Sequence, residues 1–263
     1  MGSWTERLRK NPTSWLLEKS CPSIRYRTLT EIVGLPESDH DVSRARHETY
    51  NYKPAHTIST LQNDEGTWFN SHVGFEATNV PRRRGPGTAS QYHALIEYGW
   101  GKDHPIVHRT AELLQQLLWE DPTVDLLELK GYCGGDLAVE TYLRRFLSWR
   151  ALALLSRSGF ADDPGVKRKA AERLLFLDKF YDGAIASKLV VGKHVRKKET
   201  DDGVIDEECT VMTTEAPLPD HSLWLLLAYN PDIRDSDAGR KLIDRLTTFV
   251  FSTPTPQMPV VEV

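Results

Sequence analysis

One pattern of apolar and polar positions recurs four times along the chain. Each copy starts with an apolar stretch, passes through a turn with Gly or Asn and acidic residues, and ends in a second apolar stretch. Apolar side chains three and four positions apart predict a helix on each side of every turn. The pattern predicts an all-α protein of repeated helical hairpins, with an ordinary helical bundle as the alternative. The predicted hairpins cover residues 26–44, 92–114, 149–175 and 221–246.

The predicted turns share a chemistry that ends one helix and begins the next. Gly34, Gly99 and Gly159 are expected to adopt the left-handed backbone conformation that ends a helix. The Asp after each turn is expected to cap the next helix, and Pro105 and Pro164 fit a first turn, where a missing N–H costs nothing. The predicted apolar side of the second helix consists of Leu113, Leu114 and Leu117 in the second hairpin and Leu174, Leu175 and Leu177 in the third.

Two segments lack this helical pattern. Residues 183–219 mix basic and acidic runs with prolines, and predict either an extended loop or a small β-hairpin with strands over 188–191 and 211–214. Residues 253–263 contain three prolines and predict an extended C-terminal arm. We therefore expect a single helical domain over residues 1–252.

Composition and charge narrow the class of protein. A formal net charge of −4 argues against nucleic-acid binding, which favours a basic face. No apolar run approaches the roughly 18 residues of a membrane span, and the first residues lack the apolar stretch of a signal peptide. The cysteines Cys21, Cys133 and Cys209 are odd in number and widely spaced, which favours reduced thiols. We expect a soluble, cytoplasmic protein.

A short motif, Gln62-Asn-Asp-Glu-Gly66-Thr-Trp68, follows a predicted helix. In such a motif the Gln can hydrogen-bond to backbone at a helix end, the Gly makes the turn, and the Trp packs back over it. The motif resembles the Gln-x-x-x-Gly-x-Trp repeat of terpenoid cyclases and related proteins. Residues 15–37 also resemble the N-terminus of uncharacterised bacterial prenyltransferase-like proteins of that superfamily.

The resemblance is best over residues 15–180 and implies an α/α toroid, closed or open as an arc. The first helix of each hairpin would line the interior, and the second would lie outside. The chain departs from the family in three respects. It lacks the Asp-x-Asp-Asp motif of squalene–hopene-type cyclases, it lacks the diphosphate-binding Asp-Asp-x-x-Asp motif, and it holds one copy of the Gln–Gly–Trp motif.

Aligning the hairpins on their turn residues brings polar and aromatic positions to one level. In a toroid these positions would lie at one mouth, at the N-terminal ends of the inner helices, where helix dipoles favour anions. They form the predicted substrate pocket. The alternative is that the arginines pair with surface carboxylates. The predicted substrate-binding residues are Arg25, Tyr26, Gln91, Trp149, Arg150 and Trp224.

Four residues are candidates for acid/base chemistry. Asp136 and Glu140 lie four positions apart, so they could share a proton on one helix face. The alternative is that Asp136 caps this helix. Tyr92 and His221 complete the predicted catalytic set.

His221 has a second interpretation, as a metal ligand. Residues 220–224 resemble the segment that carries a zinc-binding His in protein prenyltransferase β subunits, and Asp206 and Cys209 are further candidate zinc ligands. A helix cap or a surface His is the simpler interpretation. We therefore expect no cofactor, with zinc as the alternative.

Taken together, these features predict an enzyme for a small hydrophobic or isoprenoid-like molecule in a central cavity. Its chemistry would be acid/base (cyclisation, isomerisation or elimination), as a lyase or isomerase, because redox motifs and nucleotide loops are missing from the sequence. Arg25 and Arg150 would orient an anionic end of the substrate. One alternative is a non-catalytic helical-repeat module that binds a peptide or partner protein on its concave face. The other is a zinc-dependent prenyltransferase-like enzyme, and homo-oligomerisation is compatible with each.

Overall fold

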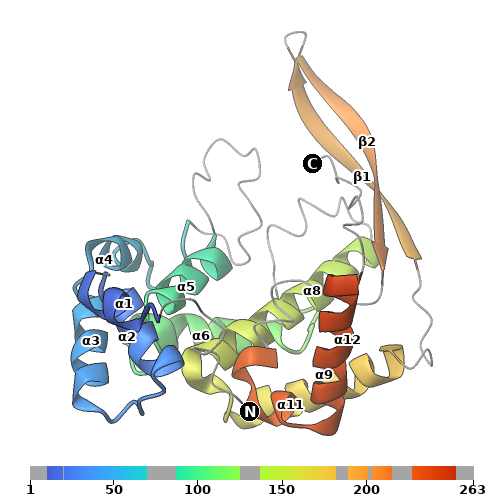
Figure 1. The fold of residues 1–263 in the computed structure, drawn as a ribbon. Coiled ribbons are helices and arrows are strands. Elements are labelled where there is room, and N and C mark those ends of the chain that lie inside the picture. Colours follow the sequence, from blue (N-terminus) through green and yellow to red (C-terminus); the bar gives the residue numbers. More distant parts are fainter. Residues whose placement is uncertain are drawn as a thin grey trace. The chain divides into compact units, whose positions relative to one another are not determined.

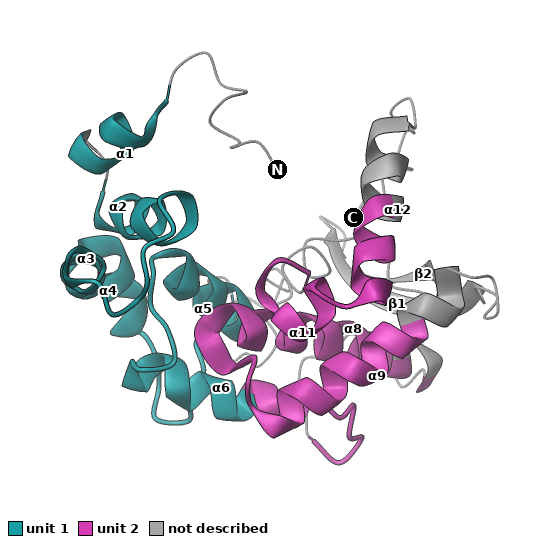
Figure 2. Ribbon diagram, turned by 60° about the horizontal axis from the view of Figure 1, so that its bottom comes forward, with its two compact units in different colours: residues 1–113 teal, residues 114–263 magenta. Residues whose placement is uncertain are grey.

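The computed structural model describes residues 11–19, 21–69, 87–124, 137–181, 189–200, 203–214 and 227–252. These residues are mostly helical (Figure 1), which confirms the predicted helical class. None of the described helices is long and apolar enough to cross a membrane. Figure 2 shows two compact units, unit 1 (residues 1–113) and unit 2 (residues 114–263). The predicted arm over 253–263 lies outside the described residues, and the single domain over 1–252 stays a prediction.

The described residues of unit 1 form short helices joined by tight turns. Proline lies in the first turn of α2 and of α4, where its missing N–H leaves no hydrogen bond unmade. Helix α2 packs against α3, and α4 packs against α5. The elements are α1 (Thr13–Lys19), α2 (Pro22–Arg27), the π-helical turn η2 (Thr28–Ile32), α3 (His40–Tyr50), α4 (Lys53–Ser59), α5 (Thr88–Glu97) and α6 (Pro105–Leu117), whose last turn belongs to unit 2.

The first predicted hairpin is formed by α2, η2 and α3. Gly34 follows the first arm with a φ of +77°, in the left-handed region, as predicted. The Asp39 carboxylate accepts hydrogen bonds from the backbone N–H groups of Asp41 at 2.8 Å and Val42 at 3.4 Å, which confirms the predicted cap. Val42 is fully buried and packs with Leu29 between the two arms.

The predicted Asp cap of the second hairpin is wrong. Asp103 lies 3.0 Å from Arg46 in an ion pair instead. The imidazole Nδ1 of His104 accepts the hydrogen bond from the N–H of Ile106 at the start of α6, at 3.3 Å. An arginine within reach thus draws the carboxylate away from the helix end, and the next polar side chain takes its place.

The Gln62 side chain joins its own turn to helix α6. Its amide nitrogen donates to the backbone carbonyl of Ile106 at 2.9 Å and to the Thr110 hydroxyl at 2.8 Å. Its amide oxygen accepts from the Arg109 guanidinium at 3.2 Å. These contacts confirm the predicted role of the motif's Gln, because Ile106 lies in the first turn of α6.

Gly66 and Trp68 complete the motif as the sequence predicts. Gly66 has a φ of +78°, and its carbonyl accepts a hydrogen bond from Thr110 at 2.7 Å. Trp68 is fully buried, and its indole N–H donates to the carbonyl of Ile58 in α4 at 2.7 Å. The motif therefore ties the end of α4 to the beginning of α6.

Unit 2 contains longer helices and a two-stranded hairpin among its described residues. Helix α9 packs against α8, α11 and α12. Its first residue is the predicted Pro164, and the Asp163 carboxylate accepts hydrogen bonds from Gly165 and Val166 as predicted. The elements are α8 (Leu137–Leu155), the π-helical turn η3 (Ser156–Phe160), α9 (Pro164–Tyr181), β1 (Leu189–Thr200), β2 (Gly203–Thr214), α11 (Pro231–Arg234) and α12 (Asp237–Ser252).

The buried face of α9 differs from the predicted one. Leu175 was expected on the apolar side, but it is 63% exposed. The buried positions are Val166, Lys169, Ala170 and Arg173. Their spacing of three and four residues defines one stripe of the helix, so α9 turns two cationic residues toward its partner helix and one leucine outward.

The fourth hairpin again lacks its predicted Asp cap. Asp235 forms an ion pair with Arg234 at 2.9 Å, and the Ser236 hydroxyl accepts from the N–H of Gly239 at the start of α12 instead. The first arm of this hairpin lies outside the described residues from 221 to 226.

Strands β1 and β2 confirm the β-hairpin alternative for the segment between the third and fourth helical hairpins. They pair antiparallel, with Val191 opposite Met212 and Thr200 opposite Gly203. Each strand is longer than the predicted segments 188–191 and 211–214, because pairing continues through the basic and acidic runs.

Gly34 and Gly66 form a matched pair for testing the Gln–Gly–Trp motif. Their φ angles are nearly equal, so replacing either with Ala adds a similar strain of roughly 1–2 kcal/mol. A Cβ at Gly34 would meet nothing within 4 Å, whereas one at Gly66 would lie 2.9 Å from Cγ of Arg109. We expect Gly66→Ala to lower the free energy of unfolding by about 1 kcal/mol more than Gly34→Ala in urea denaturation. Equal losses would contradict this close approach of the motif to α6.

Candidate functional site

The predicted substrate-binding residues of α2 contact side chains of their own unit. The Arg25 guanidinium donates to Glu48 of α3 at 2.6 Å, and the Tyr26 hydroxyl donates to Glu37 at 2.7 Å. Burial, with help from Glu37, raises the pKa of Tyr26, so the phenol stays protonated as a donor. Both side chains therefore take part in closing the first hairpin.

The predicted candidates of α5 lie in the interior of unit 1. Tyr92 is fully buried and Gln91 is 7% exposed. Both belong to the face of α5 that also buries Leu95. The Tyr92 side chain therefore has no contact with solvent.

Glu140 lies in an ion pair on α8. Its carboxylate accepts from Arg144 at 2.8 Å, and the same guanidinium donates to the backbone carbonyls of Asp121 at 3.0 Å and Val124 at 3.1 Å. Arg144 is 7% exposed. The pair joins α8 to the segment that follows α6, and Arg150 lies half-buried farther along α8.

The side chains of the remaining predicted site residues lie outside the part of the chain that the structure describes. Asp136, His221 and Trp224 lie outside the described residues. Asp206 and Cys209 lie in β2, opposite Lys197 and His194 of β1, and are described through their backbone alone. Among the side chains that the structure describes, no group of three or more His, Cys, Asp or Glu could hold a metal ion.

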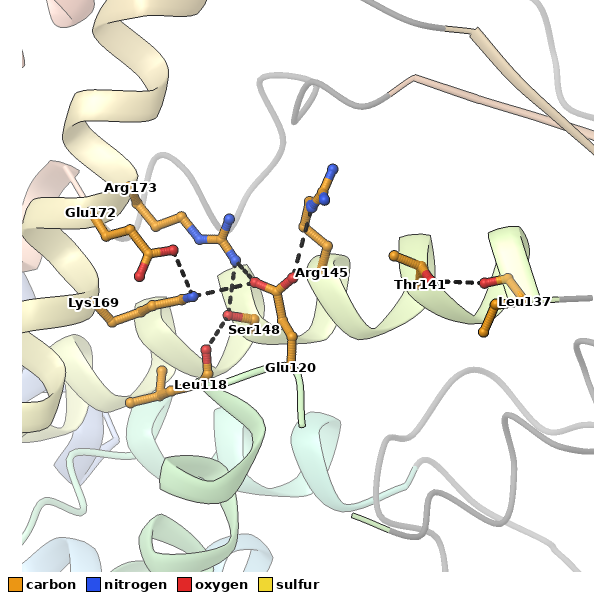
Figure 3. Close-up of polar contacts among 9 residues, drawn as sticks. All are labelled: Leu118, Glu120, Leu137, Thr141, Arg145, Ser148, Lys169, Glu172 and Arg173. Carbon is orange, nitrogen blue, oxygen red and sulfur yellow. Dashed lines mark hydrogen bonds and ion pairs between the residues drawn. The ribbon is translucent and has the colours of Figure 1, made fainter. Parts of the chain in front are cut away.

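Trp149 belongs to a polar cluster that the sequence did not predict. The guanidinium of Arg173 in α9 lies over the Trp149 ring, 4.9 Å from its centroid. Arg173 and Trp149 are 4% and 5% exposed. We call the surrounding group the Arg173 cluster, and Figure 3 draws its members other than Trp149. The cluster consists of Glu120, Arg145, Ser148, Trp149, Lys169, Glu172 and Arg173.

The Glu120 carboxylate is the centre of the cluster. Arg173 binds one of its oxygens, Lys169 Nζ lies 3.3 Å from the same oxygen, and Arg145 Nε lies 3.8 Å from the other. Burial alone would raise the pKa of Glu120, but Arg173 and Lys169 outweigh it and lower the pKa below its ordinary value. The carboxylate is therefore ionised at neutral pH.

Backbone geometry and a hydroxyl relay hold these charges in place. Glu120 has a φ of +56°, a left-handed conformation that is costly for a residue with a side chain. The Ser148 hydroxyl accepts from Arg173 at 3.0 Å and donates to the carbonyl of Leu118 at 2.7 Å. Lys169 Nζ also lies 2.9 Å from a carboxylate oxygen of Glu172, so Glu120 and Glu172 share this ammonium group. The turn that follows α6 therefore meets helices α8 and α9 at one set of charges.

Two donors of the Arg173 cluster have no acceptor among the described residues. They are Nε of Arg173 and the indole Nε1 of Trp149. Leaving such a buried donor unsatisfied costs about 1–3 kcal/mol, so an acceptor that reaches both would be bound favourably. These two donors make Trp149 and Arg173 a candidate site for an anion or another oxygen acceptor.

Sequence analysis found Trp149 but missed Glu120, Lys169 and Arg173. The predicted apolar side, with Leu174, Leu175 and Leu177, pointed to a different face of α9. One usable signal was present, because Lys169 and Arg173 lie four positions apart and so occupy one helix face.

Glu120→Gln tests whether the cluster is held by its carboxylate. The change keeps the side-chain shape and leaves Lys169 and Arg173 without their shared anion. We expect the free energy of unfolding near neutral pH to fall by about 3 kcal/mol in urea denaturation. Glu172→Gln is the control, because the Glu172 side chain is 55% exposed, and its loss should be much smaller.

The same variants predict a difference in pH dependence. Because the folded-state pKa of Glu120 is lowered, its stabilisation is complete above the ordinary value of about 4.3 and is lost as the pH falls through the folded-state pKa. The wild-type protein should lose this contribution on acidification, whereas Glu120→Gln should lack that part of the acid dependence. Parallel pH profiles would show that Glu120 is not the titrating group.

Comparisons with known proteins add no relative for this site. No protein-family model, curated protein or solved structure matches the chain significantly. The resemblance to the terpenoid cyclase and prenyltransferase-like superfamily therefore rests on residues of this chain alone, and it stays a prediction.

Proposed function

We propose that this chain binds a small molecule with an anionic group, and that the group lies against Trp149 and Arg173 in unit 2. The single observation behind this proposal is the pair of buried donors, Arg173 Nε and Trp149 Nε1, without an acceptor among the described residues. The two side chains are neighbours, since the guanidinium carbon of Arg173 lies 4.9 Å from the centroid of the Trp149 ring. In this proposal one small ligand accepts from both donors.

The surroundings favour an anion over a neutral acceptor. Arg145, Lys169 and Arg173 converge on Glu120, and Lys169 and Arg173 are buried there. Burial lowers the pKa of Arg173, and Glu120 opposes this shift, so the cation depends on nearby negative charge. A ligand anion would supply it.

Acid/base catalysis is the second candidate, with Glu140 of the same helix as Trp149 as its predicted residue. They lie nine positions apart, which corresponds to about 13 Å along the axis and to two and a half turns, so they project from opposite faces of α8. A substrate anchored at Trp149 would therefore have to pass around α8 as well as along it to reach Glu140.

The arrangement of hairpins as an α/α toroid or arc is part of the same proposal. The contacts of Gln62, Gly66 and Trp68 support it, because they match the mechanics expected of the superfamily's motif. A central cavity, cytoplasmic location, homo-oligomerisation and zinc-dependent transfer remain proposals that await ligand and localisation measurements. A peptide-binding module is the alternative outcome of the ligand screen below.

A thermal-shift screen tests the proposal. The panel holds isoprenoid carboxylates, isoprenoid diphosphates, neutral polyenes and short peptides, each with and without zinc. A ligand near 100 times its dissociation constant adds about 2.7 kcal/mol, so we expect an anionic small molecule to raise the unfolding midpoint by a few degrees.

Trp149→Phe should abolish that shift, because it removes the indole donor and keeps an aromatic ring. Trp100→Phe is the matched control, since the Trp100 indole already donates to the carbonyl of Thr49 at 3.2 Å in unit 1, and it should keep the shift. A ligand shift that survives Trp149→Phe, or a panel in which peptides alone bind, would contradict the proposed site.

A further inference from the structure

We infer that His104 is a pH-sensitive cap of helix α6 in unit 1: its neutral imidazole holds the first turn of α6, and protonation releases that turn. The inference goes beyond the proposed function, because it concerns unit 1 and involves no ligand. It is carried by the hydrogen bond that the imidazole accepts, by the rings that lie against it and by the charged groups around it.

The hydrogen bond at the start of α6 determines which imidazole nitrogen carries the proton. Pro105 has no N–H, so the first backbone donor of α6 is the N–H of Ile106, and it donates to Nδ1 of His104 at 3.3 Å. A nitrogen that accepts this bond is unprotonated, so the neutral ring carries its proton on Nε2. An imidazolium has a donor at both nitrogens. Protonation therefore sets two donors against each other, at the positive end of the helix dipole.

Ile106 is held from two sides, so the cap also affects the Gln–Gly–Trp motif. Its N–H donates to His104, and its carbonyl accepts from the Gln62 side-chain amide at 2.9 Å. The same amide donates to the Thr110 hydroxyl, one turn farther along α6. Loss of the cap should therefore disturb the contact between Gln62 and Ile106 first.

Aromatic rings keep the imidazole at the helix end. The centroid of the His104 ring lies 4.0 Å from that of Trp100 and 5.0 Å from that of Tyr50 in α3. The Trp100 indole in turn donates to the carbonyl of Thr49 in α3. Burial lowers the pKa of His104 below its ordinary value of 6.5. Because aromatic faces attract cations, a protonated ring can stay on Trp100 while Nδ1 turns away from Ile106.

The charged groups around His104 are already paired with one another. The carboxylate of Asp103, the adjacent acid, lies 3.0 Å from Arg46 of α3, and Arg46 also lies 3.4 Å from Glu37. Burial raises the pKa of Tyr50, so this phenol is uncharged at neutral pH. Further titratable groups on the elements that adjoin the ring are His47 of α3, Lys102 of the turn before α6 and His108 of α6.

An NMR titration of the full chain from about pH 8 to about pH 5 tests the cap. The ring signals of His104 are assigned in the wild-type protein, and their ¹⁵N shifts report which nitrogen is protonated. The amide signals of Ile106 and of the Gln62 side chain are followed in the same samples. His104→Asn is the test variant, because an Asn side chain also accepts a hydrogen bond at a helix start but does not titrate. His47→Asn and His108→Asn are the controls, since they remove the neighbouring imidazoles.

We expect neutral His104 to carry its proton on Nε2 and to titrate with a midpoint below 6.5. The Ile106 and Gln62 signals should move with that same midpoint in the wild-type protein and in both controls, and they should stay in place in His104→Asn. Because the folded-state pKa is lowered, the stabilisation by His104 is complete above pH 6.5 and is lost as the pH falls from there to the folded-state pKa. The midpoint of urea denaturation should accordingly fall over this range in the wild-type protein and not in His104→Asn.

Two results would overturn the inference. One is a proton on Nδ1 of neutral His104 or a midpoint at or above 6.5, which the wild-type protein shows even if His104→Asn fails to fold. The other is movement of the Ile106 and Gln62 signals that persists in His104→Asn or disappears in a control variant, because another histidine would then be the titrating group.

Discussion

Unit 2 depends on the burial of Lys169 and Arg173 against the carboxylate of Glu120. An uncompensated charge inside a protein costs several kcal/mol, so the buried stripe of α9 is compatible with folding only if a counter-charge is buried with it. Glu120 supplies that charge from the turn that follows α6, and it does so in a left-handed backbone conformation. One carboxylate therefore fixes the packing of α9 against α8, and it determines which donors of the cluster remain available.

Unit 1 joins its helices by neutral hydrogen bonds as well as by ion pairs such as that of Arg25 with Glu48. Gln62 and Trp68 use side-chain amide and indole groups to satisfy backbone carbonyls of α6 and α4. Such contacts carry no charge to compensate. The anion site is proposed in unit 2 because Arg173 Nε and Trp149 Nε1, which are buried without an acceptor among the described residues, belong to neighbouring side chains there.

The candidate site and the candidate chemistry lie apart on α8. Trp149 belongs to the Arg173 cluster, whereas Glu140 is paired with Arg144 toward the start of the same helix. A binding site for an anion does not require Glu140, but an acid/base reaction at Glu140 requires a ligand that reaches it.

The sequence by itself determined the local features: the helical hairpins, the glycines of positive φ, the prolines in first turns, and the roles of Gln62, Gly66 and Trp68. These follow from interactions between residues close in the chain or from a compact motif. Only the tertiary structure decided that Leu175 faces outward while Lys169 and Arg173 are buried, and that Asp103 pairs with Arg46 rather than capping α6. Such choices depend on partners far away in the sequence, because a charged side chain is buried or left in solvent according to where its counter-charge lies.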